Sequence, residues 1–233
     1  SALDAKLRQE LRFELKEILN TVNATTIVVT HDQEEAMSLG DSVIVMNEGK
    51  IIQEGHPTDI YEKPNSKFVA EFVGRSNWFN GNIVNKADDG ILKIKTTEGF
   101  EFNILESLTP ELSNGNYEIC VRPERISLEK NEIIDEDSYI NLLPGKVVDV
   151  AHLGPDIHTV IEVSNKRMIK VVEKYTGQVL KNNGTDVNLY FYPKDCIIVS
   201  SEKWILKLII MTKQTKISST IDYSKDGKHY GYL

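Results

Sequence analysis

The sequence is poor in cysteine, with only Cys120 and Cys196 among 233 residues. Each of these two cysteines sits in an apolar run of the kind that forms a β-strand. Their number and spacing resemble neither a disulfide framework nor a zinc site. We therefore expect two buried, reduced thiols and no metal centre.

A long apolar run is also missing. The longest stretch, Trp204–Met211, is interrupted by Lys207, and it falls far short of the roughly 20 residues that span a bilayer. The first residues have the pattern of a charged helix and lack the basic-then-apolar order of a secretory leader. These two absences predict a cytoplasmic protein.

Positive charge is scarce except near the end of the chain. The formal net charge is −8, which argues against a nucleic-acid-binding protein, because such proteins usually present a basic face. Residues 1–74 contain 7 basic and 13 acidic side chains, residues 75–200 contain 14 and 19, and residues 201–233 contain 6 and 3. The reversal predicts a boundary near Ser200 and an atypical tail over 201–233 without ordered structure.

Residues 1–74 alternate between helical and strand-like patterns. Apolar residues recur at helical spacing from Leu7 to Val22. The β-branched run Thr25–Thr30 is typical of a central strand that is buried on both faces of a parallel sheet. Asp32 and Glu35 have the spacing of a capping box that starts the next helix. A hairpin over 42–53 and short helices over 57–61 and 66–73 complete the prediction of half an α/β domain.

His31 directly follows the predicted strand over 25–30 and precedes the predicted helix. In open α/β sheets, ligands bind at this carboxyl edge of the strands. A neutral imidazole there can hydrogen-bond a γ-phosphate and orient an attacking water, since phosphoryl transfer depends mostly on positioning and charge stabilisation. The alternative is a histidine that only caps the end of the strand.

Four segments of residues 1–74 together resemble import-type ATP-binding cassette (ABC) ATPases, in order and at the right spacing. The subgroup is the one that serves sugars, polyamines, ferric iron, sulfate and phosphonates. The segments are THDQEEAM at 30–37, VMNEGKI at 45–51, GHPTDIY at 55–61 and FVAEFVG at 68–74. Gly40-Asp41-Ser42 and His56 are small departures from the family pattern.

The resemblance implies roles for particular residues and for the whole subunit. His31 matches the switch histidine that contacts the γ-phosphate, and Ser1, Ala2, Leu3 and Asp4 match the D-loop at the interface between two ATPase subunits. The intact subunit is then expected to form a homodimer that binds ATP and Mg²⁺. It is expected to drive a permease fed by a substrate-binding protein, at the cytoplasmic face of the membrane.

The phosphate-binding loop of such an ATPase is absent. No G-x-x-x-x-G-K-[ST] motif occurs in the sequence, so no lysine or backbone cradle for the β- and γ-phosphates is present. The signature loop and the Mg²⁺-binding acidic strand are missing as well. We therefore expect this chain to be inactive alone, to bind no nucleotide cofactor alone, and to expose apolar faces within residues 1–74.

Residues 75–200 read as a series of short strands separated by Gly/Asn turns, which predicts an all-β barrel or sandwich of OB-like type. In the resembling ATPases, a TOBE domain of OB-fold type follows at this position. The run CVRPERISL at 120–128 and the turn His152-Leu153-Gly154 match elements of that domain. Arg122 and Glu124 are expected to form an ion pair that fixes a strand crossing, with a ligand contact as the alternative.

A nucleic-acid partner is not predicted for the β-rich region. Single-strand binders need a basic groove with exposed aromatic residues, whereas this region is acidic, and we expect its aromatic residues to belong to the core. Those residues are Tyr175, Tyr190, Phe191 and Tyr192.

Two functional hypotheses remain. The first is a fragment of the ATP-binding subunit of an ABC importer, with His31 as its catalytic residue. The second is a non-catalytic module for dimerisation or small-ligand sensing, whose regulatory ligand the sequence does not identify.

Overall fold

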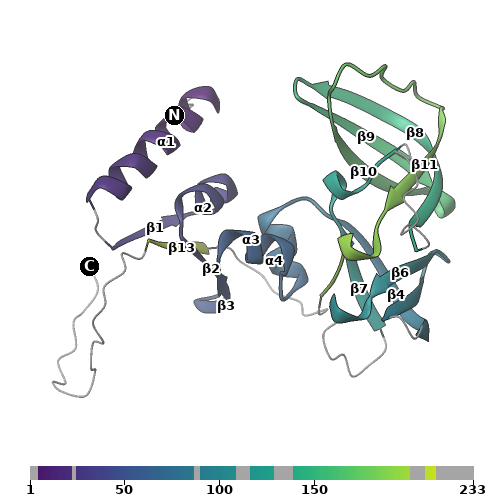
Figure 1. The fold of residues 1–233 in the computed structure, drawn as a ribbon, viewed down its shortest axis with the longest axis horizontal. Coiled ribbons are helices and arrows are strands. Elements are labelled where there is room, and N and C mark those ends of the chain that lie inside the picture. The colour runs from purple at the N-terminus through teal and green to yellow at the C-terminus, as the bar shows by residue number, and fades with distance from the viewer. Residues whose placement is uncertain are drawn as a thin grey trace.

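The computed structural model describes residues 5–22, 25–86, 90–108, 116–128, 139–199 and 208–213. These residues form an α/β lobe followed by an all-β domain, with helices α3 (Pro57–Glu62) and α4 (Lys67–Val73) lying between the lobe's sheet and the β domain (Figure 1). The fold class predicted from the sequence, a partial α/β nucleotide-binding domain followed by an all-β OB-like domain, is confirmed.

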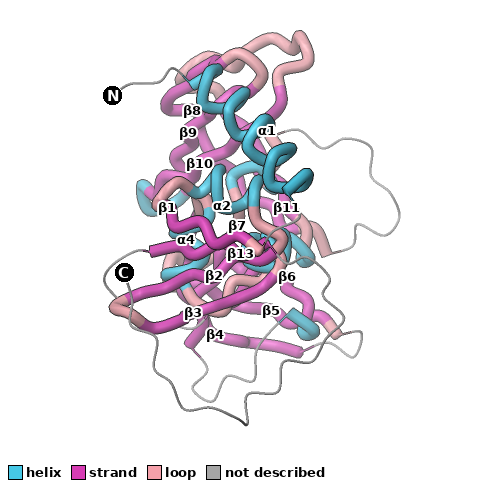
Figure 2. Tube along the Cα trace, turned by 90° about the vertical axis from the view of Figure 1, so that its left-hand side faces the viewer, coloured by secondary structure: helices cyan, strands magenta, loops and turns pink. Residues whose placement is uncertain are grey.

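Among the described residues, the α/β lobe contains four helices and a four-stranded antiparallel sheet. The sheet order is β1-β13-β2-β3, and the four strands follow one another across the lobe in Figure 2. The elements are α1 (Ala5–Val22), β1 (Thr26–Thr30), α2 (Gln33–Leu39), β2 (Ser42–Asn47), β3 (Lys50–Gly55), α3 (Pro57–Glu62), α4 (Lys67–Val73) and β13 (Leu208–Lys213).

Residues 208–213 of the predicted tail over 201–233 form strand β13, so our expectation of no ordered structure is wrong for this segment, and the rest of the tail lies outside the described residues. The strand lies between β1 and β2 and pairs antiparallel with both, with Ile210 opposite Val29 on one side and opposite Ile44 on the other. Because β1 and β2 are each antiparallel to β13, they run parallel to each other. A strand from the end of the chain therefore joins two elements that are adjacent in sequence but not paired with each other.

Strand β1 also differs from the central, doubly buried strand that we predicted. It pairs with β13 on one side and forms an edge of the sheet described here. Its alternate side chains Ile27 and Val29 remain 64% and 57% exposed. The reason is that α1 packs beside α2 and leaves one face of β1 uncovered among the described residues.

The β domain consists of two antiparallel sheets. Their orders are β12-β7-β4-β5-β6 and β10-β9-β8-β11. The strands of the first sheet are β4 (Asn77–Lys86), β5 (Ile91–Thr96), β6 (Glu101–Leu105), β7 (Asn116–Val121) and β12 (Cys196–Val199). Those of the second are β8 (Asn141–Leu153), β9 (Asp156–Val163), β10 (Arg167–Lys174) and β11 (Asp186–Phe191). Short 3₁₀ turns connect some of these strands: η1 (Glu106–Leu108), η2 (Pro123–Arg125), η3 (Ser164–Lys166) and η4 (Pro193–Asp195).

The two sheets share one hydrophobic core. Phe102 lies at its centre, with its ring edge-on to Phe79 (4.9 Å between centroids) and to Phe191 (5.1 Å). Gly81 and Gly145 permit close approach of neighbouring strands, because a Cβ would lie 2.6 Å from the Lys95 carbonyl oxygen at the first and 2.5 Å from Ile161 Cγ2 at the second.

The cysteines are buried and free, as predicted. Cys120 and Cys196 lie on the paired strands β7 and β12, and burial raises the pKa of both thiols. Within the described ranges, no helix is long and apolar enough to cross a membrane.

Candidate functional site

His31 lies immediately after β1 and before α2, at the carboxyl end of the strand as predicted. Its side chain is exposed, and among the described residues the imidazole has no hydrogen-bond partner. The residues on either side of His31 are hydrogen-bonded. The Thr30 hydroxyl donates to the Glu35 carboxylate (2.7 Å) and accepts from the Asp32 backbone N–H (3.0 Å). The imidazole is therefore presented to solvent from a fixed backbone.

Asp32 caps helix α2. Its Oδ1 accepts hydrogen bonds from the backbone N–H groups of Glu34 (2.9 Å) and Glu35 (3.2 Å). The N-cap that we predicted is thus present, but the second half of the capping box is not, because the Glu35 carboxylate is engaged by Thr30.

Asp32 forms an ion pair with Arg12 of helix α1. Arg12 Nη2 lies 2.9 Å from Asp32 Oδ2, and the same guanidinium bonds Glu34. Burial by itself raises the pKa of Asp32, but the backbone hydrogen bonds from Glu35 and Glu34 and the Arg12 charge outweigh it, so the pKa is lowered overall. Asp32 is therefore ionised throughout the neutral range.

Arg12 was not predicted as a site residue. It is only 14% exposed in its side chain, and Lys16, one turn later on α1, donates to the Ser38 carbonyl oxygen of α2 (2.7 Å). In the sequence these two residues look like ordinary charges on the polar side of an amphipathic helix. Their i, i+4 spacing was the only available signal, and it did not identify their partners.

The remaining predicted site residues do not add to this cluster. Ser1, Ala2, Leu3 and Asp4, the proposed D-loop, lie outside the described residues. Among the residues that the structure describes, no group of acidic, histidine or cysteine side chains could hold a metal ion. The cluster therefore offers one group for chemistry, the exposed imidazole of His31 at the end of β1. Asp32 and Arg12 hold the adjacent backbone in position.

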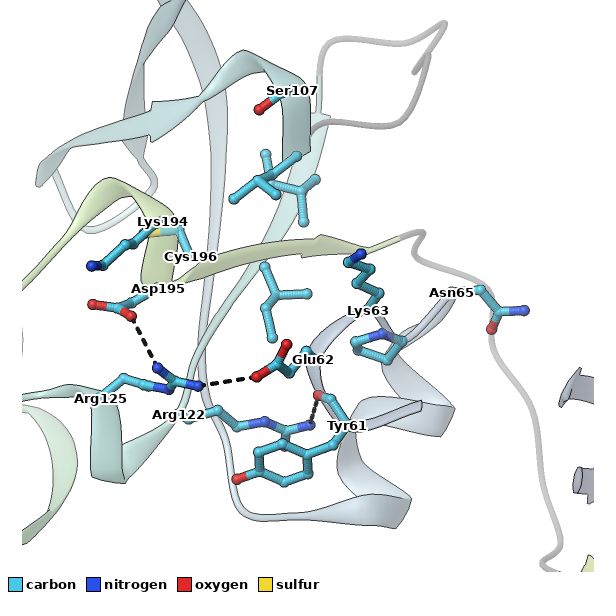
Figure 3. Close-up of a pocket in the computed structure, with 14 residues that line it drawn as sticks. Tyr61, Glu62, Lys63, Asn65, Ser107, Arg122, Arg125, Lys194, Asp195 and Cys196 are labelled. Carbon is cyan, nitrogen blue, oxygen red and sulfur yellow. Dashed lines mark hydrogen bonds and ion pairs between the residues drawn. The ribbon is translucent and has the colours of Figure 1, made fainter. Parts of the chain in front are cut away.

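A second cluster of polar residues joins the α/β lobe to the β domain. Arg122 is 2% exposed. Its Nη1 donates to the carbonyl oxygens of Ala70 (2.8 Å) and Arg75 (3.1 Å) and to the Ser76 hydroxyl (2.8 Å). Its Nη2 donates to the Tyr61 carbonyl oxygen (3.2 Å; Figure 3). One guanidinium therefore ties the end of α3, helix α4 and the connection to β4 onto the β domain.

The predicted ion pair between Arg122 and Glu124 is wrong. Glu124 accepts a hydrogen bond from the Tyr61 hydroxyl, and Arg122 lies over the Tyr61 ring, 4.4 Å from its centroid. Burial, followed by the hydrogen bond to Glu124, raises the pKa of Tyr61. The physical reason is that backbone carbonyl groups at the end of α4 and in the connection need donors, and the arginine fork supplies several at once.

Arg125 forms a more exposed link across the same junction. Its guanidinium lies 3.4 Å from Glu62 of α3 and 3.7 Å from Asp195 of η4 (Figure 3). The Asp195 side chain is 7% exposed, and burial raises its pKa. Neither Glu62 nor Asp195 was predicted, since their sequence neighbours carry no motif that pairs them with Arg125.

Comparisons with known proteins agree with both parts of the structure. Residues 119–199 match the family model described as a TOBE domain. The chain is 35% identical over 200 residues to the spermidine/putrescine import ATP-binding protein PotA of Nostoc sp. (strain PCC 7120), which covers 85% of this chain and 51% of the relative. PotA of Escherichia coli (strain K12) is 36% identical over 173 residues, covering 74% of this chain and 44% of the relative.

The chain spans about half the length of the curated relatives that it matches. The resemblance to ABC importer ATP-binding subunits that carry a TOBE domain is thereby confirmed. A solved structure of the cytoplasmic molybdate-binding protein ModG with molybdate bound covers 54% of this chain and 95% of its own, with 14% identity and a TM-score of 0.44.

Proposed function

We propose that this chain is the C-terminal portion of the ATP-binding subunit of an ABC importer, and that it contributes the switch histidine and the TOBE domain. The observation that carries this proposal is His31, an exposed imidazole at the carboxyl end of β1 beside the N-terminus of α2. The sequence identity to PotA supports it, because the alignment covers 85% of the chain and so includes parts of both lobes.

In this proposal, His31 contacts the γ-phosphate of ATP and orients the attacking water. Such positioning is most of what a protein contributes to phosphoryl transfer. Asp32 and Arg12 act on the imidazole indirectly: the cap of α2 and the Arg12–Asp32 ion pair (2.9 Å) fix the backbone on either side of the ring. They are positioning residues, and His31 is the catalytic one.

The rest of the nucleotide site comes from residues outside this sequence. Because the sequence has no phosphate-binding loop, another segment supplies the phosphate cradle and the Mg²⁺ ligands, and this chain alone binds neither ATP nor Mg²⁺. In the complete subunit, Ser1 to Asp4 lie at the interface of a homodimer.

The proposed setting is the cytoplasmic face of the cell membrane, where the complete subunit contacts permease subunits served by a substrate-binding protein. Residues 1–74 and the TOBE domain would then couple ATP hydrolysis to solute uptake. The relatives named above are spermidine/putrescine import proteins, so polyamines are the first solutes to test.

The test is complementation with the missing half. The N-terminal half of Escherichia coli PotA, which ends where the similarity to this chain begins, is mixed or co-expressed with the chain, and ATP hydrolysis is measured. We expect turnover only in the mixture, and a loss of about 10²-fold or more with His31→Asn, as for other donors to a developing anion.

The matched control is His56→Asn. His56 is also exposed, but it caps α3 by accepting from the Thr58 backbone N–H (3.3 Å), and asparagine can serve as the same kind of cap. Turnover that survives His31→Asn would exclude the proposed role of the histidine.

A second candidate function is a non-catalytic module for dimerisation or small-ligand sensing. One observation favours it: the β domain has its own continuous core, which includes buried residues from both sheets. Sedimentation over a concentration series, with and without MgATP, separates the two candidates. A dimer of the chain alone that is indifferent to nucleotide supports the module, whereas a monomer or an aggregate supports a fragment that depends on its missing half. Dimerisation of the chain alone that requires nucleotide would contradict our proposal that it binds no ATP.

A further inference from the structure

A cavity of about 710 Å³ lies at the junction between the α/β lobe and the β domain. The end of α3 and the loop after it, the turns η1, η2 and η4, and strand β12 line it (Figure 3). Its volume falls within the range of about 300–1,000 Å³ that small-molecule sites occupy. The site is distinct from the His31 end of the lobe, since the two share no residue.

One wall of the cavity is apolar. Pro64 and Leu108 contribute to it together with Ile197 of β12, whereas the next residue, Ile198, is buried in the core of the β domain. This surface can accept a flat or aliphatic body but offers few groups to orient it. Orientation must come from the charged side chains at the other wall.

The charged wall is cationic. The lining includes four cationic side chains, Lys63, Arg122, Arg125 and Lys194, and only two acidic ones, Glu62 and Asp195. This excess of positive charge stands out in a chain with a net charge of −8. A concave site lined mainly by one sign of charge concentrates ligands of the opposite sign.

The positive charges are only partly neutralised. Both acidic side chains pair with the same residue, Arg125, at 3.4 and 3.7 Å. The donors of Arg122 are taken by carbonyl and hydroxyl oxygens, which carry no formal charge. Within the described part of the chain, the ammonium group of Lys63 forms no ion pair, whereas that of Lys194 lies 5.2 Å from the centroid of the Tyr192 ring and its charge acts on Asp195.

We infer that this cavity binds a small organic anion, whose phosphate or carboxylate group is held by Arg125 and whose apolar body lies against Ile197, while the charge of Lys63, on the other side of Glu62 (Figure 3), adds to the attraction. Arg125 suits this role because a guanidinium fork binds a carboxylate or phosphate through two parallel hydrogen bonds. Its bonds to Glu62 and Asp195 are long, and the Glu62 pair is half exposed, so a ligand can replace Glu62 at the fork. Lys194, which extends beside Asp195 at the far end (Figure 3), adds long-range attraction.

The location gives the ligand a structural effect. Glu62 belongs to the α/β lobe and Arg125 to the β domain, so an anion that replaces Glu62 at Arg125 changes an ion pair between the two parts of the molecule. The inference stands apart from the proposed ATPase role, because none of these residues belongs to the His31 cluster and binding requires no ATP.

Titration calorimetry of the full chain tests the inference with phenyl phosphate, benzoate and inorganic phosphate as probes. Benzylamine and spermidine are the controls of opposite charge. We expect saturable binding of phenyl phosphate or benzoate, at least tenfold weaker binding of inorganic phosphate, and no binding of the two cations. Phenyl phosphate and benzoate together distinguish a phosphate site from a carboxylate site.

Three variants locate the site. Lys63→Gln is expected to weaken binding at least tenfold, whereas Lys174→Gln, the same change at an exposed lysine that pairs with Asp156, should leave it unchanged. Glu62→Gln should tighten binding, because it removes the carboxylate that competes for Arg125. General damage to the fold cannot produce this last result.

Several results would overturn the inference. They are the absence of saturable binding of both aromatic anions up to about 10 mM, equal effects of Lys63→Gln and Lys174→Gln, weaker binding in Glu62→Gln, or preferential binding of a cation.

Discussion

The β domain and the α/β lobe differ in how completely they bury their apolar residues. In the β domain, two sheets close over one core in which Phe79, Phe102 and Phe191 are all buried. In the lobe, Phe13 of α1 is 65% exposed, and Ile27 and Val29 on one face of β1 are also exposed. Both regions form their predicted secondary structure, so local pattern alone does not decide whether a region can complete a core.

The largest effect is expected from interrupting β13. Ile210→Pro removes a backbone N–H from the middle of the strand that joins β1 to β2. We expect the amides of β1 and β2 to lose hydrogen-exchange protection, with those of β8 to β11 unchanged, as measured by mass spectrometry. Unchanged protection of β1 would mean that β13 does not hold this sheet together.

The same substitution in the two regions measures the contrast directly. Phe102→Ala removes a fully buried ring and should cost about 3–5 kcal/mol of unfolding free energy. Phe13→Ala removes an exposed ring and should change it by about 0.5 kcal/mol or less. Denaturant unfolding of both variants provides the measurement, and equal costs would contradict the difference in burial.

Arg122 tests the connection between the regions. Arg122→Met leaves the carbonyl oxygens of Ala70, Arg75 and Tyr61 without this donor, so a loss of about 2–3 kcal/mol is expected. Calorimetry should then show two separate transitions in place of coupled unfolding. Arg125→Met is the control: its ion pairs are long and its side chain is half exposed, so its cost should stay near or below about 1 kcal/mol.

The smallest effect concerns Asp32 and pH. Because its folded pKa is lowered, its contribution to stability is present above the unfolded pKa of about 3.9 and is lost as the pH falls through the folded value. Asp32→Ala should cost about 1 kcal/mol at neutral pH and remove this acid dependence. Asp32→Asn keeps a capping oxygen but not the charge next to Arg12, so its cost should be smaller.

Asp195 provides an internal contrast in the same titration. Burial raises its pKa, so its ionisation reduces stability as the pH rises from about 3.9 through the folded value. The Asp195→Asn variant lacks this ionisation, so the difference in unfolding free energy between the variant and the parent chain should increase in favour of the variant as the pH rises between these two values. A parallel pH profile for Asp32→Asn and Asp195→Asn would contradict the opposite signs of the two shifts.

Local signals in the sequence identified most of the elements. The hairpin over 42–53 was predicted, and its turn has positive φ at Glu48 and Gly49. The position of His31 at a strand end followed from its neighbours alone, and Asp32 is the N-cap that its spacing to Glu35 predicted. These features depend on residues within one or two turns of each other.

Features that depend on distant residues were missed. The pairing of β13 with β1 joins residues more than 170 positions apart in sequence, and Arg122 was assigned to Glu124, two residues away, when its partners include residues of α3 and α4. Likewise, Phe191 is buried, but Tyr175 and Tyr192 are about 40% exposed, although all three were expected in the core. Hydrophobic character did not indicate which face of the β domain each residue occupies.

Strand β13 also determines how this protein can be assembled from two pieces. Any second polypeptide that adds a strand between β1 and β2 must first displace Leu208–Lys213. Its apparent affinity is therefore reduced by the fraction of molecules in which that position is closed. The rate of such a strand exchange reaches a plateau at high concentrations of the incoming piece, because the release of β13 then sets the pace.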